Sequence, residues 1–248
     1  MDDHELAGWL AHRALVELIA HRDEGHRRGT ALWRIEEDGD RLAHELLVAE
    51  LAAARPLDAV LSEEGHDDRS RLEADRVWIV DPLDGSSDFA YRGSTEWAVH
   101  VALVDHGAPI AAAVAVPHDC RVYGTEHLPV PVRPAPNDPP VVVAGRSWGA
   151  VSRHVAQSLG ARLTTCGSAG VKAMLVVSGA ADVYVHASGL YEWDACAPAA
   201  VAAAAGLHVS GADGRPLVYN QSRPTVAGLV VCRPELADAV LDVLDGLG

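Results

Sequence analysis

The hydrophobic residues near the N-terminus recur at the spacing of one helix face. Between His4 and His21, apolar side chains repeat at every fourth residue, at Leu6, Leu10, Ala14 and Leu18. This period predicts an amphipathic helix. A second helix is predicted from Arg41 to Ala54, because Arg55-Pro56 follows and a proline disfavours helical backbone in the residue before it.

The pattern then changes to short apolar runs that are typical of strands. Ala59–Ser62 and Arg76–Val80 are two such runs, and each ends directly before an acidic residue. Two longer runs, Trp97–Val104 and Ile110–Val116, flank a short polar turn. Together these two runs predict a β-hairpin.

A proline-rich segment divides the chain. Six of the thirteen residues from 128 to 140 are proline, which excludes regular structure there. We therefore predict an N-terminal α+β subdomain over residues 1–138 and a C-terminal α/β subdomain over residues 139–248. The elements predicted after the segment are Val141–Val143, Gly149–Leu159, Gly167–Val177, Ala181–Val185, Asp194–Gly206 and Leu207–Val209. Strands and helices alternate in this series, so we expect an α/β fold of helical layers and sheets.

Composition and charge exclude several classes of protein. The chain has 248 residues, of which 49% are hydrophobic, and a formal net charge of −15. This charge repels nucleic-acid polymers and anionic membrane surfaces, so we expect neither as a partner. No apolar run approaches the ~20 residues of a membrane helix, and the N-terminus is acidic, unlike a signal peptide, so we expect a cytoplasmic protein. The four cysteines show no C-x-x-C spacing, which argues against a zinc knuckle or a redox dithiol.

The main chemical signal is the segment Trp78–Phe89, which reads WIVDPLDGSSDF. Its apolar strand ends in Asp81 and Asp84, where backbone amides are free, and Gly85 lets the chain turn. Carboxylate oxygens are the ligands that Mg²⁺ prefers, with phosphate oxygens completing the shell. The spacing does not fit an EF-hand, which needs acids at alternate positions, or the Asp-x-Asp of an aspartyl-phosphate phosphatase. Taken alone, the segment also fits a plain turn after a strand.

From Asp40 to Val231 the chain resembles the inositol monophosphatase superfamily. The marks of this resemblance stand in order: Ser62-Glu63-Glu64, Asp81-Pro82-Leu83-Asp84-Gly85-Ser86, and Glu192-Trp193-Asp194-Ala195 before an alanine-rich helix. The segments Leu61–Glu64, Gly167–Met174 and Asp213–Asn220 resemble most the branch of 3'(2'),5'-bisphosphate nucleotidases. The resemblance implies an αβαβα sandwich and a magnesium-dependent phosphomonoesterase. Its implied substrate is an adenine nucleotide, 3'-phosphoadenosine 5'-phosphate (PAP), hydrolysed to AMP by a metal-activated water.

The resemblance also implies a role for each motif residue. The first of two or three Mg²⁺ ions is expected on Glu63, Asp81 and the Leu83 carbonyl, and the second on Asp81, Asp84 and Asp194. Asp40 and Ser86 are expected to orient and deprotonate the attacking water. Ser86 stands where the family usually has threonine, and a serine hydroxyl makes the same hydrogen bonds. The implied substrate contacts are the Gly85 and Ser86 amides, Ser168, Lys172, His186 and Asp194.

Two of these positions keep a structural alternative. Asp40 follows Gly39 near the predicted helix start, so it fits an N-cap as well as a catalytic base. Lys172 is the only lysine of the chain. It fits either a solvated helix residue or the cation for a second phosphate.

The substrate is left open by one departure from the family pattern. Ser87-Asp88-Phe89 stands where nucleotidases have a basic residue with Glu-Phe and inositol phosphatases have Thr-Asn-Phe. The alternatives to PAP are therefore a plain or modified nucleoside 5'-monophosphate and inositol monophosphate. A non-catalytic ligand sensor on the same fold is disfavoured, because all the expected carboxylates are present. By family analogy we expect a homodimer, with the Trp97–Val116 hairpin in its interface.

Overall fold

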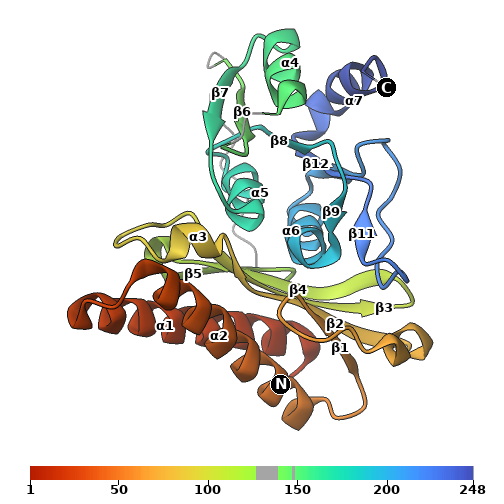
Figure 1. The fold of residues 1–248 in the computed structure, drawn as a ribbon. Coiled ribbons are helices and arrows are strands. Elements are labelled where there is room, and N and C mark those ends of the chain that lie inside the picture. The colour runs from red at the N-terminus through yellow and green to blue at the C-terminus, as the bar shows by residue number, and fades with distance from the viewer. Residues whose placement is uncertain (127–138, 147–148, 248) are drawn as a thin grey trace.

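Layers of helix and sheet alternate through the molecule (Figure 1). The computed structural model describes residues 1–126, 139–146 and 149–247. From one side to the other, the layers are α1 (Asp3–Arg28) with α2 (Leu32–Ala54), a five-stranded sheet, α5 (Ala169–Val177) with α6 (Glu192–Ala204), a second five-stranded sheet, and α4 (Ala150–Ser158) with α7 (Ala237–Asp245). This order confirms the expected αβαβα sandwich. Within the described residues, none of the helices combines the length and the apolar character that crossing a membrane requires.

Each sheet takes its strands from one side of the proline-rich segment. The first sheet has the order β1-β2-β3-β4-β5, with β1 (Ala59–Ser62), β2 (Arg76–Asp84), β3 (Ala98–Asp105), β4 (Ala108–Val116) and β5 (Arg121–Gly124). The second has the order β10-β12-β8-β6-β7, with β6 (Val141–Ala144), β7 (Arg162–Thr165), β8 (Val183–His186), β10 (His208–Ser210) and β12 (Leu229–Cys232). The division at residue 138 stays a prediction, because residues 127–138 lie outside the described part of the chain.

Short elements complete the fold. The two-stranded ladder pairs β9 (Leu190–Tyr191) with β11 (Thr225–Val226), and α3 (Ser86–Phe89) is a single turn. Three 3-10 turns are η1 (Arg69–Glu73), η2 (His118–Cys120) and η3 (Pro234–Leu236). Each C-terminal element predicted from the sequence is present with shifted bounds, whereas β7, β9, β11, β12 and α7 were not predicted.

Both N-terminal helices are longer than the hydrophobic pattern indicated. Helix α2 begins at Leu32 rather than Arg41, because Ile35, Gly39 and Ala43 continue its buried stripe. Gly39 was not recognised as part of that stripe, since it has no apolar side chain and glycine is a poor helix former. Asp40 consequently lies inside the helix, and its interpretation as an N-cap is wrong.

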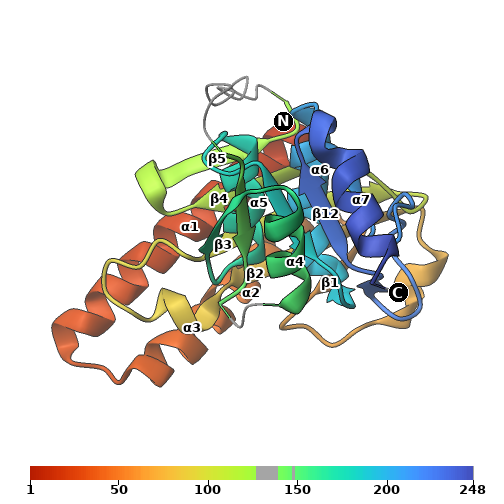
Figure 2. The same ribbon diagram turned by 90° about the horizontal axis from the view of Figure 1, so that it is seen from above.

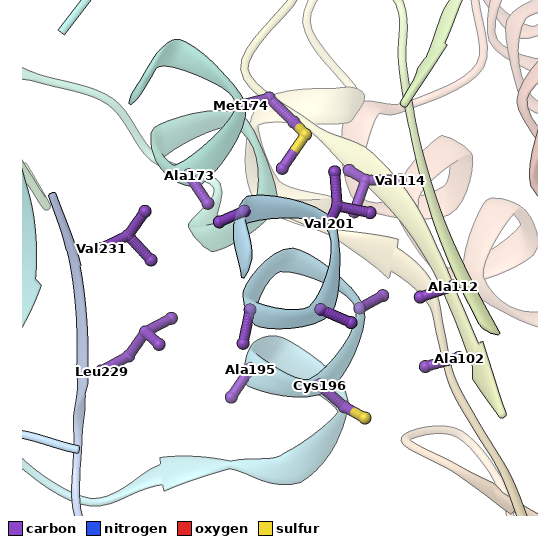
Figure 3. Close-up of a cluster of buried hydrophobic side chains, with 14 of the residues drawn as sticks. Ala102, Ala112, Val114, Ala173, Met174, Ala195, Cys196, Val201, Leu229 and Val231 are labelled. Carbon is purple, nitrogen blue, oxygen red and sulfur yellow. The ribbon is translucent and has the colours of Figure 1, made fainter. Parts of the chain in front are cut away.

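Helix α6 is the buried centre of the sandwich (Figures 2 and 3). Ala195, Cys196 and Val201 lie between Ala112 of the first sheet and Leu229 of the second. Their small side chains let the helix approach both sheets closely, as dense interior packing requires. The first turn of α6, which carries Asp194, is thereby fixed relative to both sheets.

The β3–β4 hairpin is an internal element. Its turn residues His106 and Gly107 both have positive φ, 47° and 82°, as a two-residue hairpin turn requires. Both strands are paired on each edge and lie between α1 and α6. Ile110, 41% exposed, is the one exposed large hydrophobic side chain from Trp97 to Val116, all of which is described. The strands therefore offer little surface to a partner subunit, and a part of the hairpin in the dimer interface stays a prediction for its tip, where His106, Ala108 and Ile110 are exposed.

Candidate metal centre and active site

Three carboxylates from distant segments meet at the end of β2. Asp81 and Asp84 come from β2, and Asp194 comes from the first turn of α6. One oxygen of each lies within 4.8 Å of those of the other two. Asp81 and Asp84 are both buried. Clustered buried carboxylates repel one another unless a cation or protons neutralise them, so this trio has the chemistry of a divalent-metal site.

A β-bulge lets two residues three positions apart face the same site. In a regular strand, Asp81 and Asp84 would point to opposite faces. On β3, Asp81 pairs with His100 and Asp84 with Ala98, so Pro82 and Leu83 lie opposite Val99 alone. The extra residue of the bulge shifts the alternation of side chains. Pro82 fits this position, because a bulge leaves one residue outside the ladder.

Asp81 has an unused acceptor in the middle of the site. Its Oδ1 accepts a hydrogen bond from the Leu83 amide at 3.0 Å. Its Oδ2 is buried and has no hydrogen-bond partner within the described structure. Burial raises the pKa of Asp81 and of the adjacent Glu63, and repulsion from neighbouring carboxylates adds to both shifts. The donor set and the unused oxygen fit a divalent cation such as Mg²⁺.

Asp84 has the opposite environment. The Ser168 hydroxyl donates to its carboxylate, and the Ala169 and Gly170 amides donate at 3.1 and 2.7 Å. Burial alone would raise the pKa of Asp84, but the His100 hydrogen bond and nearby positive charge outweigh it and lower the pKa to about 2. Ser168 also caps α5 through the Val171 amide at 3.0 Å. Its hydroxyl therefore holds both a carboxylate and the start of a helix, and its contact with a substrate stays a prediction.

His100 is a site residue that the sequence analysis missed. It is fully buried; its Nε2 lies 3.3 Å from Asp84 Oδ2, and its Nδ1 lies 3.0 Å from the Trp193 carbonyl. A Cβ on Gly170 would come within 2.0 Å of the imidazole, so glycine is required there. Burial lowers the pKa of His100, but Asp84 outweighs this effect and raises it. The available signal was one polar residue inside the apolar Trp97–Val104 run.

The two residues expected to activate the water, Asp40 and Ser86, lie on different helices. Asp40 projects from α2, and its pKa is raised to about 8 by burial and then by repulsion from Glu64 and Glu63. Ser86 opens α3 after Gly85, whose φ is 85°. A Cβ on Gly85 would lie 2.7 Å from the Glu96 carbonyl, so the turn requires glycine. No hydrogen bond joins Asp40 to Ser86, both of which are described.

Lys172 is buried in the described structure. It is 4% exposed, and its Nζ donates to the Gly167 carbonyl at 2.7 Å and to the Cys166 carbonyl at 3.3 Å. The alternative of a solvated lysine is therefore wrong. Burial and the Lys172 charge together lower the pKa of His186. Lys172 therefore acts electrostatically on His186 as well as on Asp84 and Asp194.

An ion pair accounts for the unusual Asp88. This residue is buried, and its carboxylate contacts the Arg146 guanidinium. Arg146 also lies 2.7 Å from Glu96, whose same oxygen accepts a hydrogen bond from the Gly167 amide at 2.8 Å. Ser87-Asp88-Phe89 departs from the family pattern, and an arginine from the C-terminal half of the chain neutralises the buried carboxylate that this departure introduces.

Known proteins resemble this chain along most of its length. A family model described as "Inositol monophosphatase family" matches residues 35–245. The 3'-phosphoadenosine 5'-phosphate phosphatase of Mycobacterium tuberculosis is 46% identical over 220 residues, which are 86% of this chain and 82% of that protein. CysQ from Bacteroides thetaiotaomicron superposes with a TM-score of 0.76 at 28% identity, over 92% of this chain and 96% of that one. Inositol monophosphatase II from Staphylococcus aureus, at 18% identity, shares the fold with a TM-score of 0.80, over 99% and 97% of the two chains.

Proposed function

Because this chain belongs to the inositol monophosphatase family, we propose that it is a magnesium-dependent phosphatase that hydrolyses PAP to AMP and phosphate. The observation that carries the proposal is the convergence of Asp81, Asp84 and Asp194 at one buried point. The identity of 46% to a PAP phosphatase supports the substrate. Phosphoryl transfer asks the protein mainly for positioning and charge neutralisation, which is what such a cluster can provide once it holds a cation.

Two or three Mg²⁺ ions are proposed per site. Glu63, Asp81 and the Leu83 carbonyl would hold one, and Asp81, Asp84 and Asp194 would hold another. When bound, the metal supplies a Lewis acid and lowers the pKa of coordinated water. The unpartnered Asp81 Oδ2 supports this assignment, since a buried acceptor without a partner is costly.

The chain's own residues are proposed to handle the water and the phosphate. Asp40, whose pKa is about 8, is suited to accept a proton near neutral pH. The Ser86 hydroxyl would orient the water, and the Gly85 and Ser86 amides would bind phosphate oxygens. Asp194 would also contact the substrate directly.

Lys172 remains our candidate for recognising the second phosphate of PAP, and His186 and Ser168 remain proposed substrate contacts. The charge of Lys172 acts on Asp84 and Asp194, so it offsets negative potential in a chain of net charge −15. Lys172→Ala is expected to raise the KM for PAP roughly tenfold, the scale of a hydrogen bond to a charged group. The KM for inositol 1-phosphate should change much less. Equal changes would assign Lys172 only to holding the Cys166–Gly167 backbone.

The ion pair of Asp88 and Arg146 reduces the case for another substrate. The unusual Asp88 was the reason to keep a nucleoside 5'-monophosphate or inositol monophosphate as alternatives. Its partner Arg146 gives this residue a structural explanation. The departure from the family pattern therefore needs no change of substrate.

A substrate panel tests the proposed function. Phosphate release is measured from PAP, AMP and inositol 1-phosphate, with Mg²⁺ and with excess EDTA. We expect PAP to have the highest kcat/KM and EDTA to abolish turnover. A preference for AMP or inositol 1-phosphate would overturn the substrate, and no release from any compound would favour a ligand sensor. A homodimer and a cytoplasmic location stay predictions, and light scattering at micromolar concentration tests the dimer.

A further inference from the structure

A buried carboxylate outside the metal cluster holds a distant loop. Glu192, the first residue of α6, is 0% exposed. Its two oxygens accept hydrogen bonds from the Asn220 amide at 2.7 Å and the Gln221 amide at 2.8 Å. Both bonds end on backbone, so Glu192 fixes the path of the loop itself.

A buried arginine holds the same loop from the other side. Arg71, in η1, is 1% exposed. It donates to Asn220 Oδ1 at 2.6 Å and to the Gln221 carbonyl at 3.1 Å, and Asn220 Nδ2 donates back to the Arg71 carbonyl at 3.0 Å. Asp67 fixes the guanidinium with bonds of 2.6 and 3.1 Å. The loop at 220–221 is therefore clamped between two buried charged groups.

The positions of these groups in the chain connect the two parts of the metal centre. Arg71 lies in the connection between β1 and β2, which starts with Glu63. Glu192 lies two residues before Asp194, in the same helical turn. The clamped loop thus joins the segment that carries Glu63 to the helix that carries Asp194. Arg71, Asn220 and Glu192 are themselves outside the Asp81, Asp84 and Asp194 trio.

We propose that Arg71 and Glu192, acting through Asn220 and Gln221, are positioning residues that set the distance between Glu63 and Asp194 and thereby the affinity for divalent metal. The inference rests on the proposed metal centre. Loss of a group hydrogen-bonded to a metal ligand typically weakens metal binding or activity by about 10–100-fold. Arg71 and Glu192 act on the ligands through the chain rather than by direct contact, so we expect an effect at the lower end of that range. Buried ion networks add little net stability compared with apolar packing, so a geometric role is the better account of this one.

Asn220 offers a change that weakens only the Arg71 arm of the clamp, which keeps its bond to the Gln221 carbonyl. Its φ is 57°, in the left-handed region that glycine adopts without steric strain. Asn220→Gly keeps the backbone amide that Glu192 binds and removes both side-chain contacts with Arg71. Asn220→Asp tolerates the same backbone and keeps an oxygen for the guanidinium. We expect the Kd for Mn²⁺ to rise roughly tenfold in Asn220→Gly and to stay within about threefold of the original in Asn220→Asp.

Asp182 supplies the matched control. It is 3% exposed and accepts from the Val141 amide at 2.6 Å and from Arg233 at 2.8 Å, so it is also a buried acid that binds backbone and an arginine. It precedes β8, at the end of that strand opposite His186. Asp182→Asn should lower the Tm and leave the Kd for Mn²⁺ unchanged.

The experiment titrates Mn²⁺ and follows the EPR signal of the free ion, below the Tm of every variant. Mn²⁺ prefers the same oxygen ligands as Mg²⁺. If the original chain binds no Mn²⁺, the proposed metal centre fails. If it binds and Asn220→Gly binds equally well, the positioning role fails while the metal centre stands. An equal loss of affinity in Asn220→Gly and Asp182→Asn would also overturn the role, because it would reflect general destabilisation.

Discussion

Asp81 and Asp84 differ in pKa because of their hydrogen-bond partners, not because one is more buried than the other. Both are buried, and they lie three residues apart on one strand. Burial and carboxylate repulsion raise the pKa of Asp81 well above its usual value, whereas donors from His100 and Ser168 bring that of Asp84 to about 2. Neighbouring acids with opposite shifts are typical of sites that assign different roles to like residues. Asp84 is therefore the better stabilised of the two carboxylates in the metal-free chain, and Asp81 is the one that would gain most from a bound cation.

Among the proposed ligands, Asp81 is the one whose substitution should reduce activity most, because it is proposed to contact both metal ions. Asp81→Asn is expected to abolish phosphate release nearly completely, because a neutral amide replaces the carboxylate proposed to contact both ions. Asp105→Asn is the control and should keep full turnover, because Asp105 is the last residue of β3 and pairs with Arg76, at the end of β2 away from the site. The readout is phosphate release across a Mg²⁺ titration. Turnover of Asp81→Asn at the level of the control would contradict the assigned ligands.

The hydroxyl of Ser86 has a separable role. Ser86→Ala should lower kcat by about 10²-fold, the scale of a positioned proton-transfer group, with little change in Mn²⁺ affinity. Ser86→Thr should keep most of the activity. Ser87→Ala removes an exposed hydroxyl from the same turn and serves as the control. Full kcat in Ser86→Ala would reduce Ser86 to a turn residue.

At the scale of elements, the sequence pattern predicted the helices and strands whose formation depends on residues close together in the chain. The hairpin of β3 and β4 and the alanine-rich α6 follow from periodicity and turn residues. The two-residue strands β9 and β11 do not, because their pairing joins residues distant in the sequence. Likewise, the motifs indicated Asp81, Asp84 and Asp194, but the bulge that turns Asp81 and Asp84 to one face is visible only in the register against β3. His100 was missed for the same reason, since its role depends on the α5 and α6 backbone.

The ion pair of Asp88 and Arg146 joins α3 to the segment before α4. A double-mutant cycle can measure how much this pair contributes to the stability of the fold. Arg146→Met leaves the buried Asp88 carboxylate without its partner, which costs about 1–3 kcal/mol for an unsatisfied buried group. Adding Asp88→Asn removes the charge that caused the penalty. We therefore expect the double variant to have a higher Tm than Arg146→Met alone. Additive losses in this double-mutant cycle would mean that the two side chains are not coupled.

At the scale of the whole molecule, the metal centre lies where both halves of the chain meet. Glu63, Asp81 and Asp84 come from the first half, and Asp194 and the donors of α5 come from the second. An ion that needs ligands from both halves binds the folded chain and not the unfolded one. Such binding adds stability by mass action, so Mg²⁺ should raise the Tm.

This stabilisation should depend on pH in a definite direction. In the metal-free chain, burial first and carboxylate repulsion second raise the pKa of Asp194 to about 7 and of Asp40 to about 8, from a usual 3.8. Acids with raised pKa values hold their protons more tightly when folded. Their contribution to stability is complete below the usual pKa and is lost as the pH rises through 7 to 8.

Metal binding has the opposite dependence, because carboxylates must lose their protons to bind a cation. We therefore expect Mg²⁺ to raise the Tm little near about pH 5 and much more near about pH 8, relative to EDTA. Thermal unfolding at each pH, with Mg²⁺ and with EDTA, measures this difference in Tm. Asp81→Asn should reduce the difference at the higher pH. An equal Mg²⁺ effect at both pH values would mean that these acids do not lose protons when the ion binds. An Mg²⁺ effect of the same size in Asp81→Asn as in the original chain would show that the cluster is not the metal centre.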